Sequence, residues 1–207
     1  MTERIRFFGD SISGNCYKLQ MASAELGIAY DWVETSVMDG STRTPEFLAM
    51  NPNGKVPVMQ LSDGRYLAES NAILSFLADG SPLAGGDRYE RANVLRWMNF
   101  EQYSHEPYIA TSRFIIKYLG GPPERQAELE AKKAGGYGAL DVMERQLAEA
   151  AWIANGAYSI ADIALYAYTH VAHEGGFSLQ DYPGVRAWLE RIEAGERYVP
   201  MRSNGHD

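Results

Sequence analysis

Cysteine is nearly absent from this chain, with Cys16 the only one among 207 residues. A single thiol excludes a disulfide framework and a structural zinc site built on cysteines, and it fits a reducing compartment. Histidine is also scarce, with four residues. His170 and His173 could share a helix face with Glu174, but no third ligand follows at helical spacing, so we predict no metal.

Long apolar runs and a basic surface are lacking as well. No segment approaches the roughly 20 apolar residues of a spanning helix, and residues 1–5 carry no signal-peptide pattern. The net charge of −8 and the pI near 5.1 argue against nucleic acid and anionic membranes, because both bind basic surfaces. We therefore expect a cytoplasmic protein with neither kind of partner.

Hydrophobic residues make up 45% of the chain, and the period at which they recur changes near Pro82. Before it, strand and helix periods alternate in the order β-α-β-α-β-β-α. The predicted strands lie at 5–7, 30–33, 56–61 and 65–68, and the predicted helices lie at 16–26, from 45 onward and at 72–77. The first strand, helix and strand form a parallel unit, and the later hairpin adds antiparallel strands.

After a linker at 81–86 the strand signals nearly vanish. Helical patterns cover 87–118 with a kink at Pro107, and they return at 140–151, 159–173 and 185–192. The pair Gly135-Gly136 is compatible with either a kink or a break. We therefore predict an α/β domain at residues 1–81 and an all-helical domain at residues 87–207.

The first motif with chemical information is Ser13-Gly14-Asn15-Cys16-Tyr17-Lys18, where the first strand turns into the first helix. Ser13 can cap that helix, and its hydroxyl projects toward the crevice at the carboxyl end of the strand. Open α/β sheets bind ligands there, and helix N-termini favour anions. A capping serine with no further role explains the pattern equally well.

The second motif is Asn51-Pro52-Asn53-Gly54-Lys55-Val56-Pro57-Val58. A proline at the start of a strand predicts an edge strand, because it cannot donate to the ladder. If the Val56–Pro57 bond is cis, Val56 turns its backbone donor and acceptor outward, and an extended peptide could pair with it. The alternative is a plain turn, since only about one X–Pro bond in twenty is cis.

The third motif is Glu69-Ser70-Asn71, between the hairpin and the next helix. Glu69 can accept from an ammonium group, while Ser70 and the backbone amides of the helix start can hold a carboxylate. Such a pairing suits the head of an α-amino acid. Simple helix capping is the alternative.

Together these motifs resemble the glutathione S-transferases, and the resemblance covers essentially the whole chain. The segment 152–162 matches a signature of the second domain in that family, with Ser159 and Asp162 as a capping box and a structural role. The resemblance implies a thioredoxin-like N-terminal domain followed by an all-α C-terminal domain, a homodimer, and detoxification of small molecules in the cytoplasm.

The resemblance also implies a role for individual residues. Ser13 matches the serine that activates the thiol of glutathione, with Ser11 as the competing candidate. Pro57 matches a cis-proline of the family. The implied glutathione-binding residues are Asn15, Lys55, Val56, Pro57, Glu69 and Ser70. Tyr103, Tyr108, Arg113 and Phe114 are expected to line an apolar second-substrate pocket between the domains. Cys16 is expected to be a buried structural residue.

The chemistry that this implies is the formation of a thiolate. A thiol with a pKa near 8.5 is only about 3% ionised at pH 7, and lowering the pKa by two units needs ~2.7 kcal/mol. A hydrogen bond to a charged acceptor contributes ~1.5–3 kcal/mol, and a helix N-terminus ~0.3–1 kcal/mol. A hydrogen bond from the Ser13 hydroxyl to the sulfur, together with the backbone amides of the helix start, can therefore account for this lowering of the thiol pKa.

The expected reaction is conjugation of glutathione, the only co-substrate implied, to a small apolar electrophile. Other enzymes could use the same thiolate, namely a glutathione-dependent isomerase, dehalogenase or peroxidase. A non-catalytic, glutathione-binding regulatory protein is the alternative from a different class.

Overall fold

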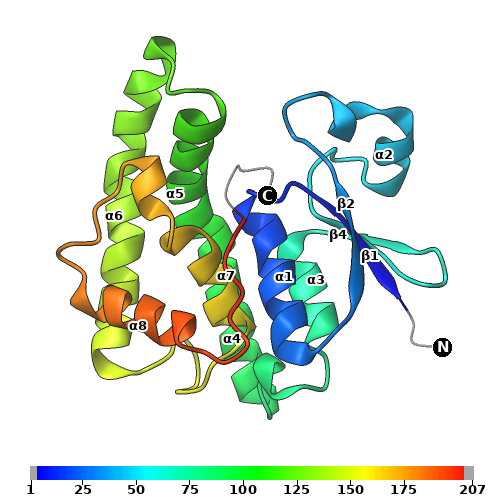
Figure 1. The fold of residues 1–207 in the computed structure, drawn as a ribbon. Coiled ribbons are helices and arrows are strands. Elements are labelled where there is room, and N and C mark those ends of the chain that lie inside the picture. The colour runs from blue at the N-terminus through cyan, green and yellow to red at the C-terminus, as the bar shows by residue number, and fades with distance from the viewer. Residues whose placement is uncertain (1–3, 203–207) are drawn as a thin grey trace. The chain divides into compact units, whose positions relative to one another are not determined.

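The structure is a computed structural model that describes residues 4–202, and they divide into two compact units. Residues 4–79 and 197–202 form the first unit, and residues 80–196 form the second (Figure 1). Residues 203–207, which end the predicted helical domain, lie outside the described part of the chain.

The first unit is built on a four-stranded mixed sheet in the order β2-β1-β3-β4. Its strands are β1 (Ile5–Gly9), β2 (Tyr30–Glu34), β3 (Val58–Gln60) and β4 (Tyr66–Ala68). Strands β1 and β2 are parallel, and β3 is antiparallel to both β1 and β4. The predicted parallel unit and hairpin are therefore both present.

The prediction that Pro57 begins an edge strand is wrong. Strand β3 lies inside the sheet, between β1 and β4. Pro57 precedes Val58, the first residue of β3 that pairs with either neighbour, so its missing N–H removes no bond from a ladder.

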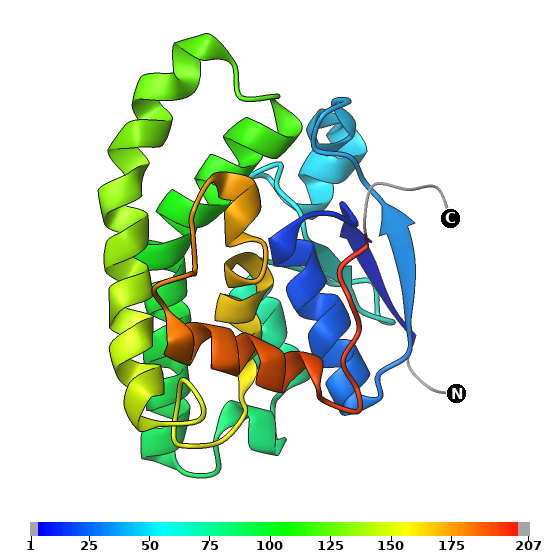
Figure 2. The same ribbon diagram turned by 60° about the vertical axis from the view of Figure 1, so that its left-hand side comes forward.

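The helices of the first unit are α1 (Gly14–Leu26), α2 (Pro45–Met50) and α3 (Ser70–Leu77). Helices α1 and α3 pack side by side on one face of the sheet (Figures 1 and 2). Leu19 of α1 and Ile73 of α3 meet Phe7 and Met59 of the sheet in a core from which water is excluded. Thr44 caps α2 as predicted, because its hydroxyl accepts from the Phe47 amide.

The second unit contains α4 (Arg88–Phe100), α5 (Glu106–Arg113), α6 (Gln126–Glu149), α7 (Ile160–Thr169) and α8 (Pro183–Glu193). Every residue of α7 is buried, and α4 and α5 both pack against it. No strand forms between residues 80 and 196, as the loss of strand signals after Pro82 predicts.

Two irregularities of the helical pattern are resolved. A π-helical segment, Glu101–His105, joins α4 to α5 immediately before Pro107, where the sequence predicts a kink. Gly135 and Gly136 do not break their helix, because α6 runs through both. These glycines leave room for the rings of Tyr108 and Phe177, which would lie within 2.5 Å of an added Cβ.

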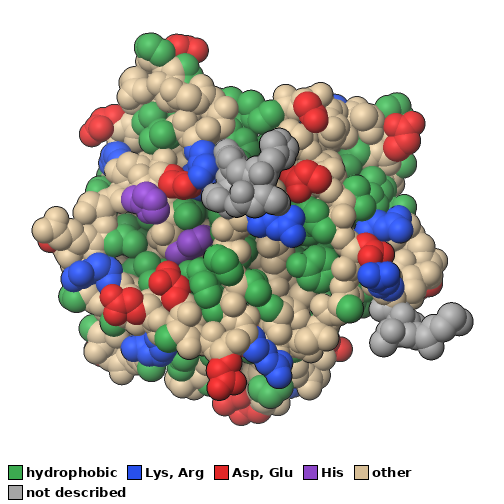
Figure 3. Space-filling view, viewed as in Figure 1, with side chains coloured by type: hydrophobic (Ala, Val, Ile, Leu, Met, Phe, Trp, Pro, Cys, Tyr) green, Lys and Arg blue, Asp and Glu red, His purple; other side chains and the backbone are tan. Residues whose placement is uncertain are grey.

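The surface in Figure 3 carries acidic and basic side chains interspersed, with hydrophobic side chains reaching the surface in small groups. On this face the net charge of −8 is not gathered into one acidic patch. Within residues 4–202, no helix combines the length and apolarity needed to cross a membrane.

Candidate functional site

All three sequence motifs meet at one end of the sheet. Strand β1 ends at Gly9 and leads into the loop before α1, and Phe8 pairs with Val58 at the start of β3. Val58 also pairs with Ala68, the last residue of β4, so Pro57 and Glu69 lie just beyond the same register position. The strand order therefore places the start of α1, the Val56-Pro57 segment and the start of α3 at the same end of the sheet.

Ser13 occupies the N-cap position of α1, but its side chain caps no amide of the helix. Its backbone N–H donates to the Asp10 carbonyl, 3.0 Å away, and its side chain hydrogen-bonds the Cys16 thiol. Ser11 is also half-buried, and its N–H donates to a carboxylate oxygen of Glu34 at 2.9 Å. The Ser13 hydroxyl is thus not occupied by capping, which is the simpler role that the sequence allows.

Cys16 is completely buried, as the sequence predicts for a structural residue. Burial raises the pKa of its thiol to about 12, although hydrogen bonds from the Ser13 side chain and the Asp10 backbone lower it. A thiol with such a pKa is not ionised near neutral pH, so Cys16 cannot act as a nucleophile there.

Asn51 fixes the loop that leads into β3. The Asn51 amide donates to the Lys55 carbonyl at 2.8 Å, and its side-chain oxygen accepts from the Asn53 N–H at 3.1 Å. The Val56–Pro57 peptide bond is cis. Within residues 4–202 the Val56 backbone enters no strand ladder, and the Lys55 side chain is exposed.

Glu69 has an unusual backbone, with φ of 68° and ψ of 111°, at the N-cap of α3. A positive φ is unfavourable for any residue except glycine and costs about 1–3 kcal/mol. The Glu69 side chain is exposed and makes no capping hydrogen bond, so helix capping does not account for it. Strain of this kind is most often maintained where the position of a side chain matters for function.

Ser70 connects α3 to α1 through a buried polar cluster. Its hydroxyl donates to the Asn15 side-chain oxygen at 3.1 Å and accepts from the Lys18 ammonium at 3.3 Å. Lys18 is fully buried and also donates to the Asn71 side-chain oxygen at 3.3 Å. A buried ammonium beside a helix N-terminus favours the binding of an anion, because both supply positive potential.

Comparison with known proteins identifies the family. The family model described as "Glutathione S-transferase, N-terminal domain" matches residues 12–79, and the model described as "Glutathione S-transferase, C-terminal domain" matches residues 126–191. A crystal structure of a glutathione S-transferase from Pseudomonas fluorescens is 53% identical to this chain, with a TM-score of 0.94. That similarity covers 96% of this chain and 99% of the other. The chain belongs to the glutathione S-transferase family.

Two named relatives show the range of this glutathione S-transferase family. Glutathione S-transferase F10 of Arabidopsis thaliana is 34% identical over 184 residues, which are 82% of this chain and 83% of that protein. Elongation factor 1-gamma 1 of Oryza sativa subsp. japonica is 29% identical over 154 residues, which are 73% of this chain and 36% of that protein. The thioredoxin-like unit followed by a helical unit is the architecture of the family.

The residues predicted to contact a second substrate differ in exposure within the helical unit. Tyr103 is 87% exposed and Phe114 is 37% exposed. Tyr108 is half-buried and packs on Gly135. Arg113 is only 2% exposed, and its Nε donates to Glu174 at 2.6 Å. Two exposed aromatic rings and one buried, ion-paired guanidinium are therefore present.

The sequence alone assigns no role to Lys18 or Asn51, and it indicates Asn71 only as part of a helix cap. Lys18 stands on a helix, where a lysine ordinarily predicts a solvent-facing side. Its burial becomes visible only once α3 packs beside α1. The helical spacing from Asn15 to Lys18 is a weak signal, since it puts both on the face that meets Ser70. Among residues 4–202, no group of three His, Cys, Asp or Glu side chains could hold a metal ion.

Proposed function

We propose that this protein is a glutathione transferase that converts bound glutathione to its thiolate and conjugates it to a small apolar electrophile. The observation that supports the proposal is that Ser13, Val56 and the Glu69-Ser70 pair all lie at one end of the sheet. A thiol, an extended peptide backbone and an amino-acid head are the three parts of glutathione that these groups would recognise.

Each group has one task in the proposed complex. Ser13 turns its hydroxyl hydrogen from Cys16 to the sulfur of glutathione and stabilises the thiolate, so no proton transfer to the serine is required. The Val56 backbone pairs with the cysteinyl residue beside Pro57. The γ-glutamyl head lies at α3, where Glu69 accepts from its ammonium group and the backbone N–H of Ser70, at the start of the helix, donates to its carboxylate.

The remaining predicted contacts complete the complex. Asn15 orients Ser70, since it accepts the hydrogen bond of that hydroxyl. Lys18 adds a positive charge beneath the carboxylate, and Lys55 meets the glycyl carboxylate from its exposed position. The proposed electrophile contacts the exposed rings of Tyr103 and Phe114, with Tyr108 and Arg113 behind them as the further residues of this predicted pocket.

The test compares Ser13→Ala with Ser11→Ala, which is the matched control. The loss of a hydrogen bond worth about 1.5–3 kcal/mol predicts a fall in kcat/KM of about 10- to 100-fold for Ser13→Ala. The pKa of bound glutathione, followed by the ultraviolet absorbance of its thiolate, should rise in the same variant. Full activity in Ser13→Ala with a loss in Ser11→Ala would assign the role to Ser11.

A non-catalytic function is the second candidate, because a protein named elongation factor 1-gamma 1 shares 29% identity with the chain. The two functions differ in what happens to glutathione. An enzyme consumes it with an electrophile from a test panel, whereas a binding protein gains thermal stability with glutathione and forms no product. Analysis of the product as conjugate, regenerated glutathione or disulfide also separates conjugation from isomerase, dehalogenase and peroxidase chemistry.

The remaining parts of the proposal concern the cell and the assembly. We place the enzyme in the cytoplasm as a homodimer with a role in detoxification, on the strength of family membership. Sedimentation at low micromolar concentration tests the dimer. A single species with the mass of one chain, 23.0 kDa, would contradict it.

A further inference from the structure

The loop that carries Ser13 is held at three consecutive backbone N–H groups. The Ser11 N–H donates to a carboxylate oxygen of Glu34 at 2.9 Å, and the Ile12 N–H donates to the side chain of Asp10 at 3.1 Å. The Ser13 N–H donates to the Asp10 carbonyl at 3.0 Å. Asp10 belongs to the loop itself, whereas Glu34 is the last residue of β2. Of these acceptors, Glu34 is therefore the one that fastens the loop to another element.

The register of the sheet brings Glu34 to this loop. Glu34 pairs with Gly9, the last residue of β1, and the Thr35 N–H donates to the Gly9 carbonyl at 2.9 Å. Side chains alternate along a strand, so Glu34 lies on the same face of β2 as Trp32 and Tyr30. Those two rings pack against the core that α1 covers. The Glu34 side chain is therefore on the side of the sheet where α1 begins.

Trp32 holds the same carboxylate from the sheet. Its indole N–H donates to the second oxygen of Glu34 at 2.8 Å. The indole ring lies so close over Gly9 that a Cβ added there would be 2.8 Å from it. Each oxygen of one carboxylate thus has its own donor, one on the sheet and one on the loop. The position of Glu34 consequently fixes the backbone of Ser11, two residues before Ser13.

The negative charge of Glu34 does not explain its presence near a thiolate site. The pKa of the Cys16 thiol is raised mainly by burial, and the negative charges of Asp10 and Glu34 raise it further. The charge of Glu34 would act on a nearby glutathione sulfur in the same direction. A residue selected here for its charge would be basic. Two acceptor oxygens, which lysine and arginine cannot supply, account better for a carboxylate at this position.

We propose that Glu34 is a positioning residue of the thiolate site, which holds the loop through Ser11 so that the Ser13 hydroxyl lies at the sulfur of glutathione. The inference rests on the proposed function, in which Ser13 donates to that sulfur. It also gives the two serines of the loop different tasks. Ser11 contributes its backbone N–H to the anchor, whereas Ser13 contributes its hydroxyl to the chemistry.

The test follows the pKa of bound glutathione, from the ultraviolet absorbance of its thiolate, in two variants of Glu34. Glu34→Ala removes the acceptor of the Ser11 N–H, and water can partly replace it at this exposed position. We therefore expect the pKa of bound glutathione to rise by about 0.5 to 1 and kcat/KM to fall about 3- to 10-fold. Glu34→Gln keeps an acceptor oxygen and lacks the charge, so the pKa should be no higher than in the parent protein.

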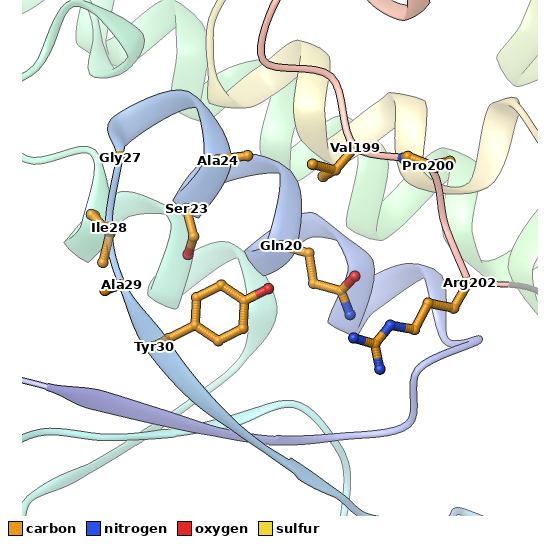
Figure 4. A pocket seen from close by; sticks show the side chains of 10 residues that line it. All are labelled: Gln20, Ser23, Ala24, Gly27, Ile28, Ala29, Tyr30, Val199, Pro200 and Arg202. Carbon is orange, nitrogen blue, oxygen red and sulfur yellow. The ribbon is translucent and has the colours of Figure 1, made fainter. Parts of the chain in front are cut away.

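A matched control lies on the same face of the same strand. Tyr30 lines a pocket beside Gln20 and Ser23, in the C-terminal half of α1 and away from Ser13 (Figure 4). Tyr30→Phe should leave both the pKa of bound glutathione and kcat/KM at the parent values. A change in Tyr30→Phe as large as that in Glu34→Ala would mean that any disturbance of β2 has this effect, and it would overturn the specific role of Glu34.

A double-mutant cycle separates positioning from folding. If Glu34 acts through Ser13, Glu34→Ala should leave the pKa of bound glutathione unchanged in a Ser13→Ala background. An equal rise in both backgrounds, no rise in Glu34→Ala, or an equal rise in Glu34→Gln would overturn the role of Glu34 and leave the proposed function intact. A parent protein that does not lower the pKa of glutathione would instead overturn both.

Discussion

Asp162 offers a quantitative test of how the helical unit is held together. Its carboxylate is fully buried and accepts four hydrogen bonds. One oxygen accepts from the Ile153 N–H and the Trp188 indole N–H, both at 2.9 Å. The other accepts from the N–H and the hydroxyl of Ser159, both at 3.0 Å. One side chain therefore ties the preceding loop and α8 to the start of α7.

Removing the Asp162 carboxylate should lower the free energy of unfolding, because its hydrogen-bond donors lose their acceptor. Asp162→Ala leaves three buried N–H groups without an acceptor, and each such group costs about 1–3 kcal/mol. We therefore expect a loss of about 4 kcal/mol or more in the free energy of unfolding, which is exceptional for one substitution. Asp181→Asn, at an exposed aspartate in the same unit, should change it by less than about 0.5 kcal/mol.

The ionisation of Asp162 makes the test sensitive to pH. Burial raises its pKa from 3.8 to about 6, and the hydrogen bonds from Ile153, Trp188 and Ser159 only partly oppose this. Between pH 6 and pH 4 the folded protein holds the proton while the unfolded chain releases it. The contribution of Asp162 to the free energy of unfolding therefore grows as the pH falls, by up to about 3 kcal/mol.

The assay is urea unfolding from pH 7 to pH 4, with the parent protein compared with Asp162→Asn at each pH. The variant keeps the shape of the side chain and lacks the titration, so the difference between the two proteins isolates this group from other titrating residues. That difference should widen as the pH falls from 7 to 4. A difference that stays constant or narrows would refute the reasoning.

Three further predictions concern packing, reactivity and strain. Gly136→Ala should lower the free energy of unfolding by about 1–2 kcal/mol, because the added Cβ would lie 2.3 Å from the Phe177 ring. Gly138→Ala, with nothing within 4 Å, should raise it by up to about 1 kcal/mol in the same urea titration. Cys16, buried and with a pKa raised to about 12, should react with a thiol reagent only after unfolding, and fast labelling of the native protein would contradict this. Glu69→Gly should be more stable than Glu69→Ala by about 1 kcal/mol, since only glycine relieves the positive φ, while both lose affinity for glutathione; equal stability would exclude the strain.

The features that could be predicted from the sequence are the local ones. The capping box of Ser159 and Asp162 is present, because its residues lie three apart on one turn and need no distant partner. The strands and helices of the first unit follow the periodicity of their apolar residues for the same reason. The exact start of a strand is less certain, since β3 begins at Val58 rather than at Val56.

What could not be predicted depends on pairings between distant segments. The position of β3 inside the sheet follows from its pairing with β1, at least 50 residues earlier, and no property of Pro57 reveals it. The burial of Lys18 depends on Ser70 and Asn71, which lie more than 50 positions away. The backbone of Glu69 is imposed by the junction of β4 with α3, and nothing in the residue itself favours a positive φ.

The residues that depart from their ordinary local preferences lie together, at the end of the sheet where the three motifs meet. Ser13 stands at an N-cap and caps no amide, Lys18 is charged and buried, and Glu69 has a backbone that suits glycine. A scaffold selected only for stability would favour a capping hydroxyl, an apolar side chain and a glycine at these positions. Asp162 is the opposite case, since its four donors are satisfied by its carboxylate and we expect Asp162→Ala to destabilise the unit. Structural residues and site residues should therefore differ in the sign of the stability change on substitution. That sign, measured by urea unfolding at Ser13, Lys18 and Glu69, tests whether these residues belong to the site.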